Sequence, residues 1–193
     1  MTENQPTRLT TPRQREVFTT LLDAFLDEGL SWFTVDAAAA RLHCSKSTLY
    51  ALGRTGDDIV RRVLVAFFKD VTRRTERSLN THPDPLNSLL AYFDAMGAAM
   101  TPASPAFMKD AASMPVAREV YDTNTRAAAR TIGDLIAAAV ESGEFRPVPV
   151  DFMTGLITAA LEHIQQGATG SLEVSQAYSE LGRLVVDGLA ART

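Results

Sequence analysis

The polar residues at positions 45–50, Ser-Lys-Ser-Thr-Leu-Tyr, are the part of the sequence best suited to bind an anionic partner. Hydroxyl and ammonium groups donate hydrogen bonds to phosphate oxygens and to base edges in a DNA groove. The stretch offers three small hydroxyl side chains, the charge of Lys46 and the phenol of Tyr50. This composition indicates a nucleic-acid contact. Solvated polar residues on a helix surface are the alternative interpretation of the same residues.

Two short predicted helices, residues 35–42 and 45–52, place this stretch in a helix-turn-helix motif. Thr34 is a good N-cap for the first helix, and residues 43–44 form the turn. The second helix is then the recognition helix, whose first residues point into the major groove of DNA. A small residue, Ala39, fits where the two helices approach each other. An ordinary helical hairpin has a similar apolar pattern, so the DNA-binding interpretation depends on the polar stretch.

Apolar residues recur at the 3.6-residue spacing of helices along nearly the whole chain, and no period-two alternation indicates a strand. The sequence therefore predicts an all-α protein of about nine helices, with a long fourth helix capped by Thr55 or Gly56. The helices are expected at residues 12–28, 35–42, 45–52, 57–81, 85–100, within 101–115, and at 117–142, 151–166 and 173–191.

The charge of the chain is unevenly distributed. The 193 residues carry a formal net charge of −4. Residues 1–81 hold 12 Lys and Arg against 10 Asp and Glu, whereas residues 82–193 hold 7 against 13. A basic N-terminal part is compatible with a nucleic-acid partner. No apolar run reaches the roughly 20 residues of a membrane span, and residues 1–16 lack the apolar core of a secretory signal. We therefore expect no membrane partner and a cytoplasmic location.

Few residues suit enzymatic or metal chemistry. His43, His82 and His163 lack the spacing of metal ligands, and the single cysteine, Cys44, excludes a zinc cluster of several cysteines. The sequence contains neither a glycine-rich phosphate loop nor a nucleophile motif. The protein is therefore expected to be no enzyme and to hold neither a metal nor a cofactor.

The helix-turn-helix stretch resembles the TetR family of bacterial transcriptional regulators over about residues 12–68. The family pattern runs roughly Thr-Val-x-x-Ile-Ala-x-x-Ala-Gly-Val-Ser-x-Gly-Thr-Leu-Tyr-x-His-Phe-x-x-Lys-x-x-Leu. The matching residues here are Thr34, Val35, Ala39, Ser45, Thr48, Leu49, Tyr50 and Ile59. The departures are His43, Ser47 and Gly56, at two glycines and a lysine of the pattern, and Leu52-Gly53 at its His-Phe pair. Arg54 offers a positive charge near the missing lysine.

The resemblance implies a three-helix DNA-binding domain, residues 1–56 with an N-terminal arm. A long fourth helix joins it to a helical effector-binding and dimerisation domain, residues 57–193. It further implies double-stranded operator DNA, a small-molecule effector and a second copy of the chain as partners. The expected function is a repressor that an apolar or aromatic effector releases from its operator. The residues expected at DNA are Thr34, Ser45, Lys46, Ser47, Thr48, Tyr50 and Arg54.

Methionine and aromatic residues of the C-terminal domain are candidates for the effector site, because such side chains form adaptable apolar walls. A purely structural role in the core is the alternative for each of them. The candidates are Phe93, Met96, Met100, Phe107, Met108, Met114, Tyr121, Phe152 and Met153.

The last two predicted helices carry apolar stripes that suit a four-helix dimer interface. Packing within one subunit is the alternative interpretation. The interface candidates are Leu156, Ile157, Leu161, Ile164, Leu181, Leu184 and Val185. A second reading of the whole chain also stays open: a helical protein that binds small molecules or other proteins and whose helix-turn-helix has lost its affinity for DNA.

Overall fold

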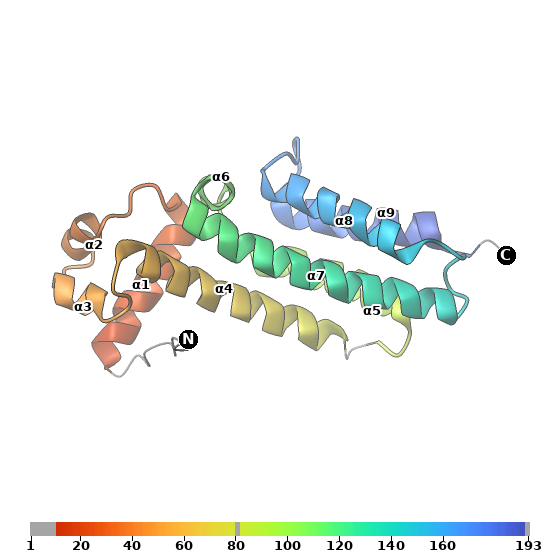
Figure 1. Ribbon diagram of the computed structural model, residues 1–193, viewed down its shortest axis with the longest axis horizontal. Helices are drawn as coiled ribbons and strands as arrows, with labels where there is room; N and C mark the ends of the chain where they lie inside the picture. Colours follow the sequence, from red (N-terminus) through yellow and green to blue (C-terminus); the bar gives the residue numbers. More distant parts are fainter. Residues whose placement is uncertain (1–10, 80–81, 192–193) are drawn as a thin grey trace. The chain divides into compact units, whose positions relative to one another are not determined.

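The computed structural model describes residues 11–79 and 82–191, which form nine α-helices and one isolated β-bridge, between Phe145 and Ala190 (Figure 1). The predicted N-terminal arm, residues 1–10, and the predicted end of the fourth helix at residues 80–81 lie outside the described residues. The helices are α1 (Pro12–Glu28), α2 (Val35–Arg41), α3 (Lys46–Tyr50), α4 (Gly56–Leu79), α5 (Pro85–Met100), α6 (Pro105–Ser113), α7 (Pro115–Glu141), α8 (Val150–Gln165) and α9 (Val174–Leu189).

Local capping signals explain where the helices begin. The amide of Gln14 donates to the hydroxyl of Thr11 at 3.1 Å, and the Thr11 amide donates to the Gln14 side chain at 3.2 Å, which closes a capping box before α1. Gly29 ends the helix with a φ of +85°, a left-handed value that a glycine adopts without strain. Because these signals are local, the predicted and observed bounds of α1 agree.

The chain divides into two compact units, each built from two separate segments. The first unit comprises residues 1–68 and 103–120, and the second comprises residues 69–102 and 121–193. Both α4 and α7 contribute residues to the two units. The structure therefore differs from the domain boundary expected at residue 56, because α6, which packs on α1, and the first part of α4 belong to the same unit as the helix-turn-helix.

The core of the first unit joins α1, α4 and α6. Phe25 of α1 contacts Trp32 and Phe33 in tilted and edge-on ring arrangements, and Phe67 of α4 meets Phe107 of α6 with 5.7 Å between ring centroids. The fully buried residues of this core include Leu21, Phe25, Leu30, Leu49, Ile59, Val63, Leu64 and Phe107. The helix-turn-helix thus rests on a core that α6 completes.

In the second unit α5 and α9 approach each other closely at two glycines. A Cβ atom on Gly97 of α5 would lie 2.5 Å from the carbonyl oxygen of Ser175. One on Gly182 of α9 would lie 2.7 Å from the Cβ of Phe93, a buried residue of α5. Side chains at these two positions would force the helices apart.

Among the described residues, no helix is both long and apolar enough to span a membrane.

Candidate nucleic-acid interface

The predicted recognition helix, α3, combines one buried leucine with an exposed polar face. Leu49 is fully buried, whereas Tyr50 is 49% exposed. Ser45 caps the helix by accepting from the Thr48 amide at 3.2 Å, and its hydroxyl also bonds those of Ser47 at 2.7 Å and Thr48 at 2.9 Å. The expected DNA-contacting hydroxyls therefore form one hydrogen-bonded cluster on the surface, and Ser45 lies before the helix rather than inside it.

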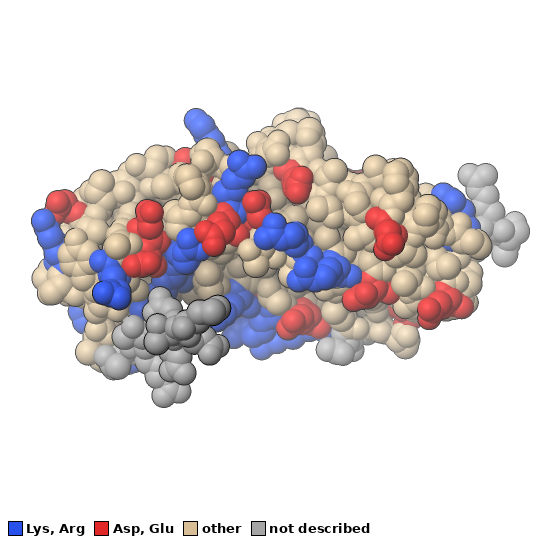
Figure 2. Space-filling view, viewed as in Figure 1, with Lys and Arg blue, Asp and Glu red and all other residues tan. Residues whose placement is uncertain are grey.

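Lys46 is exposed and forms an ion pair with Asp36 of α2. The hydrogen bond and the negative charge of Asp36 raise the pKa of Lys46, so the ammonium group stays protonated. Contact with a phosphate would require Lys46 to exchange one anion for another. Basic and acidic side chains lie interspersed on the face of the molecule seen in Figure 2, in keeping with such local pairs.

Arg13 of α1 holds the turn between α2 and α3. His43 adopts a φ of +46°, a left-handed conformation that favours glycine. The Arg13 guanidinium donates to the carbonyl oxygens of Leu42 at 3.0 Å and His43 at 3.1 Å. The turn therefore keeps the geometry that the family's glycine would permit. Ala38 rather than Ala39 is the fully buried small residue of α2.

The remaining departures from the family pattern fit the connection between α3 and α4. Leu52 is 2% exposed and belongs to the core. A Cβ atom on Gly53 would lie 2.6 Å from the amide nitrogen of Ile59, so only glycine allows this close approach to α4. Thr55 and Asp58 cap α4 reciprocally, with the Asp58 amide 3.1 Å from the Thr55 hydroxyl. Arg54 is exposed in this turn.

Thr34, the remaining residue expected at DNA, caps α2: its hydroxyl oxygen accepts a hydrogen bond from the Ala37 amide at 3.0 Å.

The effector-site candidates do not gather in one unit. Phe107, Met108 and Met114 belong to the first unit, where the first two are buried and Met114 is half-buried. In the second unit, Phe152 is 62% exposed on α8, which differs from the expected position in a cavity wall. The other candidates of that unit are the buried Phe93, Met96, Met100 and Tyr121 and the half-buried Met153.

A buried polar chain crosses the second unit. The hydroxyls of Tyr121 and Tyr178 are hydrogen-bonded to each other, and Tyr178 also bonds Gln165, whose amide donates to Thr125 at 2.5 Å. Burial raises the pKa of Tyr178 to about 12, even though its hydrogen bonds oppose the rise. Both phenols are therefore neutral donors at ordinary pH. Sequence reasoning selected Tyr121 alone, because helical periodicity does not distinguish a buried tyrosine with a partner from one without.

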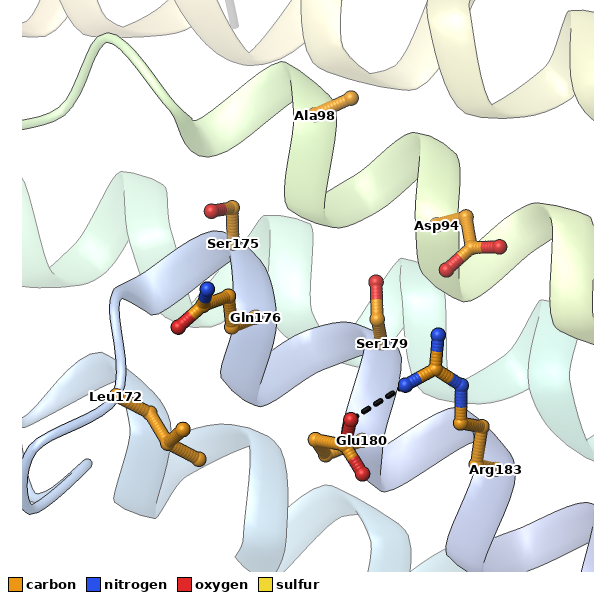
Figure 3. A pocket seen from close by; sticks show the side chains of 8 residues that line it. All are labelled: Asp94, Ala98, Leu172, Ser175, Gln176, Ser179, Glu180 and Arg183. Carbon is orange, nitrogen blue, oxygen red and sulfur yellow. Dashed lines mark hydrogen bonds and ion pairs between the residues drawn. The ribbon is translucent and has the colours of Figure 1, made fainter.

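A polar groove lies between α5 and α9, with a volume of about 530 Å³ (Figure 3). Arg183 and Glu180 form an ion pair of 2.5 Å along its side, and Asp94 faces them from α5. The groove contains none of the predicted effector residues. Its lining consists of Asp94, Ala98, Leu172, Ser175, Gln176, Ser179, Glu180 and Arg183.

The interface candidates separate into buried and exposed residues. Leu184 of α9 is 70% exposed, Leu156 of α8 is 50% exposed, and Leu181 is half-buried. Ile157, Leu161, Ile164 and Val185, in contrast, are buried within their own subunit and cannot be the surface that a partner covers. Phe152 extends the exposed set by one turn of α8. We call Phe152, Leu156 and Leu184 the α8–α9 apolar face.

Comparison with solved structures identifies the fold. No protein-family model and no curated protein matches the chain. The ketosteroid transcriptional regulator KstR2 of Mycobacterium tuberculosis is 20% identical, with a TM-score of 0.63 over 97% of this chain and 100% of that one. A TetR transcriptional regulator from Chloroflexus aurantiacus is 18% identical, with a TM-score of 0.72 over 93% of this chain and 97% of that one. The fold is that of the TetR-family transcriptional regulators. A third solved structure, described as a transcriptional regulator from Saccharomonospora viridis in complex with choline, is 18% identical, with a TM-score of 0.68 over 93% of this chain and 98% of that one.

The TetR fold confirms the expected all-α architecture, whereas the individual site residues stay predictions. Within this TetR-fold chain the sequence reasoning missed Arg13 and Arg62, which bind backbone carbonyls on either side of α3. No motif marks such residues, because their partners are backbone atoms far away in the sequence. His43, His82 and His163 belong to no cluster of three possible metal ligands in the described part of the chain.

Proposed function

We propose that this protein is a transcriptional regulator that binds double-stranded operator DNA through α3. The observation that carries the proposal is the exposed polar face of α3, with Ser47, Lys46 and Tyr50, on a helix-turn-helix anchored by Leu49. Helices of this kind insert their first residues into the major groove. Binding to DNA implies a cytoplasmic location in a bacterial cell.

The proposed regulator is a repressor that a small molecule releases from DNA. The resemblance to a regulator named for ketosteroids and to one solved with choline supports a small organic effector. Buried Phe93, Met96 and Met100 favour an apolar or aromatic compound. Since α4 contributes to both units, it is the candidate connector between effector and DNA. Linkage requires that operator weakens effector binding by the same factor by which effector weakens operator binding.

The proposed active form is a homodimer. A contiguous patch of exposed apolar side chains marks an interaction surface, and we propose that Phe152, Leu156 and Leu184 form such a patch. A two-fold dimer would present two copies of α3, which must reach successive major grooves roughly 34 Å apart. The α8–α9 apolar face is the candidate interface, in place of the buried stripe of Ile157, Leu161 and Ile164.

DNA binding is tested with fluorescently labelled DNA from upstream of the protein's own gene. Lys46→Ala should weaken binding across sequences and reduce the slope of log affinity against log salt by roughly 0.9, the value for one lost phosphate contact. Tyr50→Phe should weaken binding without this change of slope. Lys69→Ala is the matched control, because Lys69 is exposed on α4 in the second unit. Equal effects of all three substitutions would contradict the proposal.

The alternative function is a helical ligand-binding or interaction protein without affinity for DNA. It predicts that the unaltered protein binds upstream DNA no better than unrelated DNA at physiological salt. The effector is sought by titrating aromatic and other apolar compounds against a preformed DNA complex. If Phe93 and Met96 line the effector site, Phe93→Ala and Met96→Ala should change the response to the compound and leave the DNA affinity of the ligand-free protein unaltered. Loss of DNA binding without the compound would show instead that these two buried side chains belong to the core. A tightly bound compound that leaves DNA affinity unchanged is not the effector.

A further inference from the structure

The recognition helix α3 has little capacity to fix its own orientation. It contains five residues, Lys46–Tyr50, of which Leu49 alone is buried. Isolated helices shorter than about 12 residues are marginal in water, so tertiary contacts must hold such a helix in place. Together with Leu52, just beyond the helix, Leu49 is its apolar anchor, and contacts this few restrain the rotation and tilt of the helix only weakly. Other groups must therefore fix the direction of its polar face.

Arg62 of α4 binds the carbonyl end of α3. Its Nη1 atom donates to the Leu52 carbonyl oxygen at 2.9 Å and, more weakly, to that of Ala51 at 3.4 Å. Carbonyl groups at a helix C-terminus lack partners within the helix and carry partial negative charge. The Arg62 guanidinium group donates hydrogen bonds to these carbonyl groups and offsets their partial negative charge. Arg62 is half-buried, and burial lowers its pKa, so a contact that offsets the cost of desolvation is needed there.

Arg13 of α1 binds the turn before α3. Its Nη2 atom donates to the carbonyl oxygens of Leu42 and His43, which Cys44 separates from the cap residue Ser45. Its Nη1 atom pairs with Glu16 at 2.8 Å, which orients the guanidinium group. Because His43 has a left-handed backbone, the turn would lose strain by relaxing, and the two hydrogen bonds oppose that relaxation.

We propose that Arg13 and Arg62 are positioning residues for DNA recognition. Two guanidinium groups, from α1 and α4, hold the turn before α3 and the carbonyls after it. They set the direction in which Lys46 and Tyr50 face the groove, without contacting DNA themselves. The proposal rests on the proposed function, and it predicts that orientation rather than charge limits affinity when either arginine is lost.

Salt dependence separates a positioning role from a direct phosphate contact. Arg13→Met and Arg62→Met keep much of the side-chain stem and remove the donors. Each variant should lower operator affinity at least about tenfold at every salt concentration and leave the slope of log affinity against log salt unchanged. Arg61→Met is the matched control, because Arg61 neighbours Arg62 but pairs with Glu119 of α7 at 2.8 Å. This control should bind DNA nearly as well as the unaltered protein.

A readout without DNA distinguishes failure of this inference from failure of the proposed function. Backbone amide hydrogen exchange of residues 44–53 should quicken in Arg13→Met and Arg62→Met, whereas exchange in α5 and α9 should stay unchanged. Arg62→Lys, which retains the positive charge on a single donor nitrogen, should recover part of both affinity and protection, and it replaces Arg62→Met if that variant does not fold. Unchanged protection of α3 in both variants overturns the proposal, whether or not the protein binds DNA. If the slope of log affinity against log salt falls by roughly 0.9 in either methionine variant, the proposal is overturned as well, because that arginine would then be a phosphate contact.

Discussion

Leu184→Glu should separate the proposed homodimer into folded monomers. Leu184 is 70% exposed on α9, so the substitution leaves the core of the subunit intact. Complete burial of a leucine stabilises an assembly by about 1.5–3 kcal/mol, which for this exposed fraction gives about 1–2 kcal/mol per copy. A two-fold dimer carries the substitution twice, so the loss is about 2–4 kcal/mol and the dimer Kd rises about 30- to 1,000-fold. Desolvation of the two glutamates adds to this loss.

Sedimentation velocity over a range of protein concentrations measures this shift. Leu172→Glu is the matched control, because Leu172 is 43% exposed but lines the polar groove instead of the α8–α9 apolar face. The control should dimerise as the unaltered protein does, and both variants should keep the same helical circular dichroism. A charge at Leu161 would be a poor test, since this residue is 1% exposed and its replacement would unfold the subunit. If Leu184→Glu and Leu172→Glu dimerise equally well, α9 does not form the interface through Leu184.

Three further substitutions test contacts within the units. Asp110 of α6 is 7% exposed; burial alone would raise its pKa, but bonds from Ser31 and from the Leu30 and Ser31 amides lower it. The ionised carboxylate therefore stabilises the fold above the unfolded-state pKa of about 3.9, and this contribution is lost as the pH falls through the lower folded-state pKa. Asp110→Asn should lower the free energy of unfolding, measured in urea, by about 1.5–3 kcal/mol at pH 7 and by less at acid pH. An equal loss at the two pH values would contradict this reasoning. Gly97→Ala should lower stability by about 1–3 kcal/mol in the same assay, because its Cβ meets Ser175, and an unchanged midpoint would show that α5 and α9 can separate without cost. Asp36→Asn should raise operator affinity by releasing Lys46 and by removing a negative charge beside α3; weaker binding in anisotropy titrations would mean that the ion pair helps orient Lys46.

The helices were predictable from sequence because their signals are local. The bounds of α1 and α5 agree with the prediction, since a capping side chain and a proline mark each start. The predicted recognition helix, residues 45–52, was longer than α3 because Ser45 acts as its cap and Ala51 ends it. Periodicity also identified α8, but could not tell which apolar residues of this helix face the core.

Contacts between distant segments were not predictable in the same way. Leu156 is exposed and Ile157 is buried, although both belong to one apolar run. Arg13 lies 29 residues before Leu42, whose carbonyl oxygen it binds. No sequence pattern distinguishes such an arginine from one that is simply solvated. The ion pair of Lys46 with Asp36 depends likewise on how α2 and α3 pack.

The discontinuous first unit has a consequence for protein engineering. Asp110 binds the loop after α1, with its Oδ2 atom 2.6 Å from the Leu30 amide, and the Ser104 amide donates to the Leu26 carbonyl at 2.8 Å. Phe107 fills the core beside Phe67. A fragment cut at residue 56 or 68 would expose these surfaces and leave the Leu30 amide without its acceptor. A chimaera that grafts the helix-turn-helix onto another sensor must therefore transplant residues 103–120 together with the N-terminal segment.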